Sequence, residues 1–358
     1  MRVAFNPSSV SRLMVRATNW LGDAVMSLPA IRALRQTFPR AHMAVVTRPW
    51  VADLYERETS IDRVIPYPAQ RGLPAKLDFA ASLRQEHFDA AILLQNAFDA
   101  ALMAWLAGIP ERIGYRRDTR GFLLTRAIPV PEPGDIPRHQ RFYYLELLRR
   151  AGLIERFPDC EAIRLDGCAT VRQCGAAQLA SRGIRGPVMG ISPGAAYGDA
   201  KRWLPERFAE CAALVAEANT AFLLFGSTAD SGVCEQVAAR LHPLPVLNLA
   251  GQTTLGEFID LAAVCRLFLT NDSGAMHIAS ALGVPTVAVF GATDDTATGP
   301  TGPMARVIRG HAECSPCLLR ECPIDHRCMT RVSSAQVARV ARELREESAP
   351  AWTHEAKS

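Results

Sequence analysis

Lysine is nearly absent from this sequence. Of its 40 basic residues only Lys76, Lys201 and Lys357 are lysines, and the others are arginines. The lysine ammonium is a compact point charge that the planar guanidinium of arginine does not reproduce, so each remaining lysine is a candidate for a specific role. Lys357 lies in a polar tail and Lys76 in a surface helix, whereas Lys201 lies in a motif described below.

Long apolar segments are also lacking. No apolar run reaches the ~20 residues that a helix needs to cross a bilayer, and the first residues, MRVAFNPSSVSR, lack the apolar core of a signal peptide. The chain has ten cysteines, and without an export signal these favour a cytoplasmic protein with reduced thiols. A length of 358 residues suits two domains.

The glycine spacing of a dinucleotide-binding fingerprint is missing. Where the first strand should meet the first helix, residues 19–23 read Asn-Trp-Leu-Gly-Asp rather than G-x-G-x-x-G. This disfavours an NAD-dependent oxidoreductase.

Charge is unevenly distributed along the chain. Residues 1–150 contain 21 Arg or Lys and 14 Asp or Glu, a balance of +7, and the remaining residues contain 19 and 22, a balance of −3. An acidic partner of the N-terminal half would explain this difference. A solvated basic surface explains it equally well.

Short apolar runs alternate with amphipathic segments along the chain, which predicts parallel sheets covered by helices on both faces. The proline-rich residues 127–138 and the turn-rich residues 154–186 interrupt this alternation and are expected to be irregular. The predicted fold class is therefore α/β, with two doubly wound, Rossmann-like domains in series and a cleft between them. We place these domains at residues 1–175 and 176–332. Residues 333–358 are expected to form a helix and tail, with packing back on the first domain as one option.

The expected elements follow from this pattern. The strands are residues 13–20, 42–47, 63–67, 90–94 and 112–115, and then 188–192, 221–225, 246–249, 267–270 and 286–290. The helices are residues 24–36, 49–56, 74–86, 97–107 and 139–153, and then 205–218, 231–241, 254–264, 275–282 and 333–347.

The most informative segment is residues 267–291, LFLTNDSGAMHIASALGVPTVAVFG. It predicts a buried strand, a sharp polar turn, a short helix and a second buried strand. The turn would leave backbone N–H groups of Ser273, Gly274 and Ala275 at a helix N-terminus beyond the carboxyl end of a strand, where α/β sheets bind ligands. An anion site and a helix that Asp272 or Ser273 simply caps explain this segment equally well.

Asp23 opens the first long helix directly after the first strand. A carboxylate at this position can point into the expected cleft. An acidic residue that caps or begins a helix is also common, so both interpretations stay open.

A glycine-rich loop brings Lys201 and Arg202 to the start of another helix. The loop follows a strand that ends at Ser192 and reads PGAAYGDAKRW. Two cations beside such a loop suit a diphosphate whose charge rises as it leaves. The scarcity of lysine favours this function over an ordinary surface loop.

Two weaker signals lie in the same half of the chain. Gly226 and Ser227 follow a strand and could meet a ribose or phosphate, and Asp230 could bind ribose hydroxyls. Helix capping by Thr228 or Asp230 explains this motif equally well. His277, one turn into the helix after Ser273, could donate to a bound phosphate, although a lone helical histidine is more often structural.

Four cysteines cluster near the C-terminus: Cys314, Cys317, Cys322 and Cys328, with His326 nearby. The first pair has the spacing of metal ligands, but the second pair is loosely spaced and only four residues separate the pairs. We therefore favour reduced thiols that pack a loop and expect no metal, with structural zinc as the alternative.

A basic stretch occupies strand ends and a loop of the first half. Its members are Arg112, Arg116, Arg117, Arg120, Arg138, His139 and Arg141. Neither a nucleic-acid-binding motif nor interleaved aromatic residues accompany them, which argues against nucleic acid as a partner. A phosphorylated, acidic acceptor fits this stretch better.

Four segments resemble one family, the lipopolysaccharide heptosyltransferases. They are NWLGDAVMSLPAIRALRQTFP, SPGAAYGDAKRWLPERFAE, LTNDSGAMHIASALGVPTVAVFGATD and CSPCLLRECPIDHRCM. The resemblance spans roughly residues 12–348, in order. The cysteine-rich end is most similar to the heptosyltransferase II branch, the ADP-heptose:lipopolysaccharide enzymes.

The resemblance implies a GT-B fold, with the donor in the C-terminal and the acceptor in the N-terminal domain. It implies an inverting, metal-independent transfer of L-glycero-D-manno-heptose from ADP-heptose to the first heptose of the lipopolysaccharide inner core. The acceptor would be phosphorylated Kdo2-lipid A carrying heptose, whose lipid would bring the enzyme to the inner face of the inner membrane. No cofactor is implied, and the lack of a convincing D-x-D metal motif agrees with this.

The motifs and the resemblance together assign the site. By the resemblance, Asp23 is the general base and Lys201 neutralises the departing ADP. Donor-binding residues are Ser192, Gly226, Ser227, Asp230, Asp272, Ser273, Gly274 and His277, and acceptor-binding residues are Asn19, Arg112, Arg116, Arg117, Arg120 and His139. Relatives often have glutamate at the position of Asp230, so this chain differs there by a chemically conservative substitution.

Two alternatives stay open. Heptosyltransferase I or III would share the fold and differ in acceptor, which loops of the first domain decide. A non-catalytic nucleotide-sugar-binding protein is the alternative from another class, and the presence of both Asp23 and Lys201 argues against it.

Overall fold

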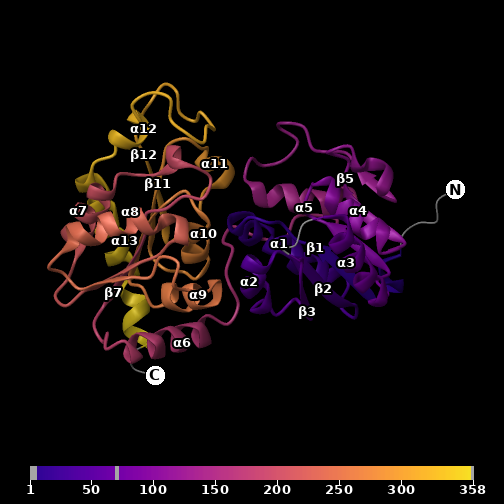
Figure 1. Cartoon of the computed structure of the whole chain (residues 1–358), viewed down its shortest axis with the longest axis horizontal. Helices are drawn as coiled ribbons and strands as arrows, with labels where there is room; N and C mark the ends of the chain where they lie inside the picture. Colours follow the sequence, from indigo (N-terminus) through magenta and orange to yellow (C-terminus); the bar gives the residue numbers. More distant parts are fainter. Residues whose placement is uncertain (1–5, 69–71, 356–358) are drawn as a thin grey trace. The chain divides into compact units, whose positions relative to one another are not determined.

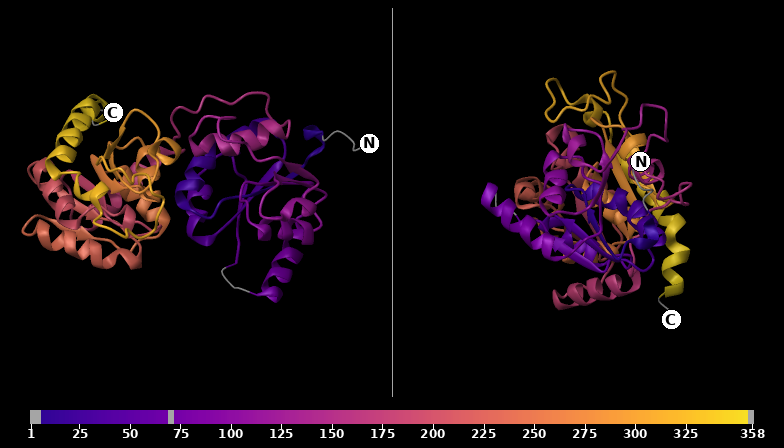
Figure 2. Two further views of the ribbon diagram at one scale, coloured as in Figure 1. Left: turned by 90° about the horizontal axis from the view of Figure 1, so that it is seen from above. Right: turned by 90° about the vertical axis from the view of Figure 1, so that its right-hand side faces the viewer.

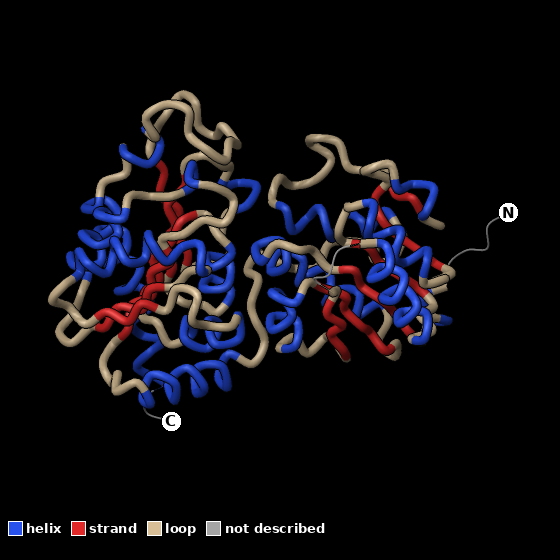
Figure 3. The backbone as a smooth tube through the Cα atoms, in the orientation of Figure 1, coloured by secondary structure: helices blue, strands red, loops and turns tan. Residues whose placement is uncertain are grey.

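The computed structural model describes residues 6–68 and 72–355, with side chains as far as Ser348. The chain divides into two compact units, Met1–Cys160 and Glu161–Ser358. Each unit contains one six-stranded sheet whose neighbouring strands all run parallel, with helices packed around it (Figures 1 and 3).

The N-terminal sheet has the strand order β3-β2-β1-β4-β5-β6. Its strands are β1 (Arg12–Arg16), β2 (His42–Thr47), β3 (Arg63–Pro66), β4 (Ala90–Leu93), β5 (Glu111–Tyr115) and β6 (Arg126–Ile128). Its α-helices are α1 (Leu21–Thr37), α2 (Ala52–Glu56), α3 (Leu73–Gln85), α4 (Phe98–Leu106) and α5 (Gln140–Arg150). Short 3-10 helices are η1 (Pro7–Ser9), η2 (Pro49–Val51) and η3 (Arg120–Leu123). Helix α3 packs against α4, and α1 packs against α5.

The C-terminal sheet has the order β12-β11-β10-β7-β8-β9. Its strands are β7 (Val188–Ser192), β8 (Ala221–Leu224), β9 (Val246–Asn248), β10 (Leu267–Asn271), β11 (Thr286–Phe290) and β12 (Ala305–Arg309). Its longer helices are α6 (Cys168–Ser181), α7 (Pro205–Val215), α8 (Ser231–Leu241), α9 (Leu255–Ala263), α10 (Gly274–Ala281) and α13 (Ser334–Glu355). Single-turn elements are α11 (Asp295–Thr298), α12 (Arg327–Thr330), η4 (Asp199–Lys201) and η5 (Thr228–Asp230).

The two sheets share one topology. Numbered within its own unit, each sheet has the order third, second, first, fourth, fifth, sixth. In such sheets ligands bind beyond the carboxyl ends of the first and fourth strands, where the order reverses. These strands are β1 and β4 in the first unit and β7 and β10 in the second, so the fold points to the loops that follow them.

Helix α13 belongs to the core of the C-terminal unit. It packs against α7, β11 and β12 (Figure 2, yellow), and its buried Val337, Ala341 and Leu344 join the apolar cluster that α7 and α8 form on the sheet. In the same unit, α6 packs against α9. Among residues 6–68 and 72–355, no helix is long and apolar enough to cross a membrane.

Several segments differ from the sequence-based expectations. Residues 154–186, expected to be irregular, contain α6. The expected domain boundary after residue 175 therefore falls inside a helix that packs within the second unit. Strands β6 and β12 and helices α11 and α12 were not predicted, β1 is shorter than predicted, and α1 begins at Leu21. Asp23 consequently lies within the first turn of α1.

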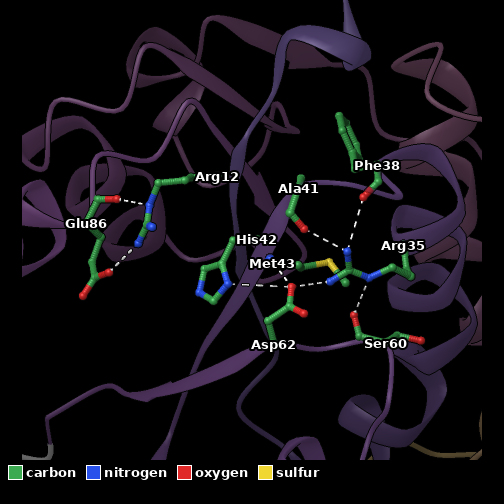
Figure 4. Close-up of polar contacts among 9 residues, drawn as sticks. All are labelled: Arg12, Arg35, Phe38, Ala41, His42, Met43, Ser60, Asp62 and Glu86. Carbon is green, nitrogen blue, oxygen red and sulfur yellow. Dashed lines mark hydrogen bonds and ion pairs between the residues drawn. The ribbon is translucent and has the colours of Figure 1, made fainter.

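Arginines at the amino edge of the N-terminal sheet have structural partners (Figure 4). Arg35 donates to three backbone oxygens and pairs with Asp62. Arg12 and Arg63 both pair with Glu86, each at 2.8 Å. Part of the basic excess of residues 1–150 therefore stabilises the fold and is not available to a partner.

Candidate functional site

The first turn of α10 presents backbone donors beyond the carboxyl end of β10. Ser273 occupies the N-cap position, but its side chain makes no cap hydrogen bond and lies 3.1 Å from the hydroxyl of Thr270 instead. Helix α9 shows the contrast, because Thr254 and Glu257 form a complete capping box there. Ser273 and Gly274 are partly exposed. The side chain of Ser273 therefore does not cap α10, and the anion site at this helix start stays a prediction.

Asp272 holds Lys201 beside this helix start. Its Oδ2 accepts a hydrogen bond from Lys201 Nζ at 2.6 Å and another from the hydroxyl of Thr293. The Lys201 side chain is 13% exposed and that of Asp272 6%. Lys201 Nζ also lies 4.7 Å from the ring centre of Tyr197. Because Asp272 is engaged in this way, the structure favours a role in positioning Lys201.

Asn271 fixes the Lys201 loop to β10. Its buried side chain donates to the carbonyl of Pro193 at 2.7 Å and accepts from the backbone N–H of Trp203 at 2.9 Å. Both ends of the loop after β7 are thereby tied to the same strand end. Ser192, the buried last residue of β7, lies opposite Thr270 in the parallel ladder. The sequence did not single out Asn271, although an asparagine that ends a buried strand is a usable signal.

Asp230 is occupied by structural bonds. Its side chain forms a capping box with Ser227, and its Oδ1 accepts from Arg202 at 3.1 Å. A Cβ on Gly194 would lie 2.3 Å from the carboxyl carbon of Asp230, and one on Gly226 would lie 2.8 Å from its Cβ. Both glycines are therefore needed for close packing. The structure thus shows the capping bonds of Asp230, and its binding of a ribose stays a prediction.

His277 lies in α10, one turn after Ser273, and is 5% exposed. The structure thus brings the Lys201 loop, Asp272 and the first turn of α10 together at the carboxyl ends of β7 and β10. This is the position that the topology of the sheet marks for a ligand.

The four clustered cysteines line one pocket, together with His326. No three His, Cys, Asp or Glu side chains in the described part of the chain are arranged to hold a metal ion, so the zinc alternative has no formed ligand set. Burial raises the pKa of the Cys328 thiol, and the neighbouring cysteines raise it further. This direction favours the thiol form of Cys328.

The cysteine-rich segment, residues 312–328, supports the loops of the anion site. Tyr197 donates its hydroxyl hydrogen to the Leu318 carbonyl at 2.8 Å, and the Ala200 N–H donates to the Arg320 carbonyl at 3.0 Å. The Leu318 N–H donates to the carbonyl of Ala292, next to Thr293, at 2.7 Å. One segment therefore joins the Lys201 loop to the loop that carries Thr293.

In the N-terminal unit, Asp23 is oriented by Tyr144. The Tyr144 hydroxyl, on α5, donates to Asp23 Oδ1 at 3.0 Å. Burial raises the pKa of Tyr144 well above its ordinary value and the nearby Asp23 raises it further, so the phenol remains a donor at neutral pH. Asn19, four residues before Asp23, accepts through Oδ1 from the buried Arg16 at 3.1 Å. Tyr144 has no sequence motif that marks it.

The predicted acceptor-binding residues separate into two groups. Arg120 is fully buried and donates to backbone oxygens, and burial lowers its pKa to about 10. Arg112 likewise donates to backbone oxygens. These two support the fold, which differs from the expectation that they face an acceptor. Arg116 and Arg117 are exposed beyond the end of β5, and the Nδ1 of His139 caps α5.

Comparisons with known proteins agree with this arrangement. Residues 77–327 match the model of glycosyltransferase family 9 (heptosyltransferase). Lipopolysaccharide heptosyltransferase 2 of Escherichia coli strain K12 is 32% identical over 310 residues, which cover 83% of this chain and 88% of that one.

Solved structures share the fold. The structure of E. coli ADP-heptose LPS heptosyltransferase II has a TM-score of 0.79 and 28% identity, over 94% of this chain and 99% of that one. E. coli heptosyltransferase WaaC, solved with ADP, has a TM-score of 0.70 and 18% identity, over 93% and 99%. With the family model matching well over half of its length and two sheets of this topology, the chain belongs to glycosyltransferase family 9, the heptosyltransferases, and has their GT-B fold.

Proposed function

We propose that this heptosyltransferase moves L-glycero-D-manno-heptose from ADP-heptose to the first heptose of the lipopolysaccharide inner core, with inversion and without a metal ion. The observation that carries the proposal is the uncapped first turn of α10 beside the Lys201–Asp272 pair. Backbone donors and a fixed cation at one sheet edge suit a diphosphate. The 32% identity to lipopolysaccharide heptosyltransferase 2 supports the choice of acceptor.

The transfer is a displacement at the anomeric carbon of the donor. The acceptor hydroxyl oxygen forms a bond to this carbon while Asp23 takes the hydroxyl proton, which contributes roughly 10²–10⁴ in rate when the geometry is right. The bond from the anomeric carbon to the β-phosphate oxygen breaks, and its electron pair leaves with ADP.

The charge on the diphosphate rises during this step. Lys201 and the backbone N–H groups of Ser273 and Gly274 stabilise that charge, since they are already in place before the reaction. Asp272 and Thr293 keep Lys201 oriented. His277, Gly226 and the exposed Ser227 complete the proposed donor site around these groups.

The acceptor belongs to the N-terminal unit in this proposal. The residues proposed to bind its phosphorylated sugars are Asn19, Arg116, Arg117 and His139. Arg112 and Arg120 instead stabilise the fold of this unit. An acceptor anchored by lipid A places the reaction in the cytoplasm, at the inner face of the inner membrane.

A transfer assay with ADP-heptose and defined truncated cores tests the proposal. We expect transfer to a core that carries one heptose and no transfer to a heptose-free core, with EDTA without effect. Transfer to the heptose-free core would instead identify a heptosyltransferase I. Binding of ADP-heptose without transfer to any core would identify a non-catalytic protein. Asp23→Asn should lose turnover and keep ADP binding.

A further inference from the structure

Exposed aromatic side chains gather at one edge of the N-terminal sheet. Trp20, Trp50 and Phe98 follow the carboxyl ends of β1, β2 and β4, and Phe122 pairs with Phe98 at 6.2 Å between ring centres. All four are exposed, Trp50 to 58% and Trp20 to 56%. Because the strands are parallel, their carboxyl ends share the edge that carries Asp23. Single exposed aromatics are ordinary, but a group of them marks a binding surface.

Trp50 is held in place despite its exposure. Its indole N–H donates to the backbone oxygen of Asn19 at 3.0 Å, so the one polar atom of the side chain is already bonded. The surface that Trp50 presents is therefore mainly the apolar ring. Asn19 directly precedes Trp20, the N-cap of α1, and Asp23 lies in the first turn of that helix. The exposed ring is thus fixed to the segment that carries the proposed base.

A cation accompanies this ring. The guanidinium carbon of Arg48 lies 5.6 Å from the centre of the Trp50 ring and 4.6 Å from that of Tyr67. Its Nε is buried and has no hydrogen-bond partner among the described residues. At the opposite edge of the sheet, Arg12 and Arg35 are neutralised by carboxylates (Figure 4). Arg48 differs from them in its bonding: its Nη1 donates to the backbone carbonyl of Pro68 at 3.4 Å, and no carboxylate among the described residues is paired with it.

We propose that Trp50 and Arg48 form a stacking site for an anionic pyranose ring of the acceptor. One face of a pyranose carries C–H groups, which pack against the electron-rich face of an indole. A carboxylate or phosphate on the same sugar would meet the guanidinium of Arg48. The inference rests on the proposed function, since it takes the acceptor to be an acidic saccharide. It extends the acceptor site from Asp23 along the sheet edge.

Steady-state kinetics with a deacylated, heptose-bearing core oligosaccharide test this site. Trp50→Ala should raise the acceptor KM about tenfold, the loss typical of a stacked tryptophan, with kcat and the ADP-heptose KM unchanged. Trp50→Phe keeps a ring and should recover most of the affinity. Arg48→Gln should also raise the acceptor KM. If phosphate is the bound anion, that increase disappears with a dephosphorylated acceptor; if it is a carboxylate, the increase persists.

Trp105 provides the matched control. It is also exposed, to 50%, but lies near the end of α4 that is remote from the carboxyl edge. Trp105→Ala should leave both KM values unchanged. Equal acceptor KM values for Trp50→Ala and Trp105→Ala would overturn the proposal. It would also be overturned if Trp50→Ala raised the acceptor KM only with an acylated acceptor, because the Trp50 ring would then contact the lipid and not the sugar. Should the wild type bind the oligosaccharide in calorimetry without transferring heptose, the proposed function fails, and the Kd of Trp50→Ala still tests the stacking site.

Discussion

At the scale of single residues, each ionised group proposed for catalysis has a dedicated partner. Asp23 accepts from Tyr144 at 3.0 Å, and Lys201 bonds to Asp272, which Thr293 also contacts. Such partners set the direction of a reactive group before substrate arrives, and a small error in that direction is costly in rate. The supporting residues are therefore as open to experiment as the reactive ones.

Tyr144→Phe should lower kcat about tenfold, because a hydrogen bond to a charged group contributes about 1.5–3 kcal/mol. The bond also favours the ionised carboxylate, so its loss should move the acid limb of the kcat–pH profile to higher pH. Steady-state rates from acidic to neutral pH measure both effects. An unchanged pH profile would mean that Tyr144 only packs α5 against α1.

Lys201→Ala should reduce kcat far more than it changes the KM for ADP-heptose, because Lys201 is expected to act mainly on the charge that develops as ADP departs. Thr293→Val removes one contact to Asp272 and should reduce kcat in the same direction by a smaller factor. Initial rates at varied donor concentration measure both variants. A change in KM alone would show that Lys201 binds ground state and transition state equally.

The sequence marked Asp23, Lys201 and Asp272 as candidates, but it did not mark Tyr144 or Thr293, which contact them. Asp272 directly follows β10, and Lys201 lies in the loop after β7, so the local sequence pattern was enough to mark both. Tyr144 lies 121 residues from Asp23 and Thr293 lies 21 residues from Asp272, so only the packed fold brings them into contact. Asp230 is the opposite case. Its capping partner, Ser227, lies only three residues away in the sequence, so the cap could be predicted locally.

At the scale of elements, the two helices α9 and α10 begin in different ways. Thr254 and Glu257 cap α9 fully, whereas the side chain of Ser273 leaves the first turn of α10 uncapped. A helix start without a cap gives up stability, and the N–H groups it leaves open can bind a ligand. The comparison predicts that the same type of substitution changes stability at one helix start and not at the other.

Thr254→Ala should destabilise the C-terminal unit by about 1 kcal/mol, the usual contribution of an N-cap, and leave ADP affinity unchanged. Ser273→Ala should have little effect on stability, because the Ser273 side chain makes no cap hydrogen bond. It should also leave ADP affinity unchanged, because the backbone N–H groups proposed to bind the diphosphate remain. Urea unfolding and calorimetric titration with ADP measure the two quantities. Equal losses of stability in the two variants would contradict an uncapped α10.

The elements that the sequence missed lack the usual pattern. Helix α6 packs so closely on α9 that a Cβ on Gly175 would lie 2.1 Å from the backbone oxygen of Asp260. Gly175 stands between the buried Val171 and Leu179 on this face of α6, so the apolar stripe is interrupted and periodicity marks it only weakly. Strands β6 and β12 form sheet edges and contain arginines, whereas a buried central strand such as β4 is an uninterrupted apolar run.

At the scale of the whole molecule, donor binding and acceptor binding are proposed for two different units, each with its own core. The donor residues all lie in Glu161–Ser358 and the proposed base and acceptor residues in Met1–Cys160. Alternating strands and helices predicted two such α/β units. The common strand order of the two sheets was not predicted, because similar topology requires no similar sequence.

ADP should stabilise the C-terminal unit selectively, by about 2.7 kcal/mol at a hundredfold excess over its Kd. Hydrogen exchange followed by mass spectrometry should show slower exchange in peptides of β7, β10 and α10, with peptides of β1–β6 unchanged. Deacylated core oligosaccharide should give the opposite distribution. Equal protection of both sheets by ADP would contradict this division between the units.

The pairing of Lys201 with Asp272 has a spectroscopic consequence. Reductive methylation with ¹³C-formaldehyde labels amino groups and keeps their charge, and this chain offers only three lysine side chains. Its carbon spectrum should therefore contain very few methyl signals. The Lys201 signal should be shifted by the adjacent carboxylate and should move again when ADP is added, while the Lys76 signal, near Asp99, stays in place. Because lysine is so rare in this chain, a single ammonium group can be observed directly during nucleotide binding.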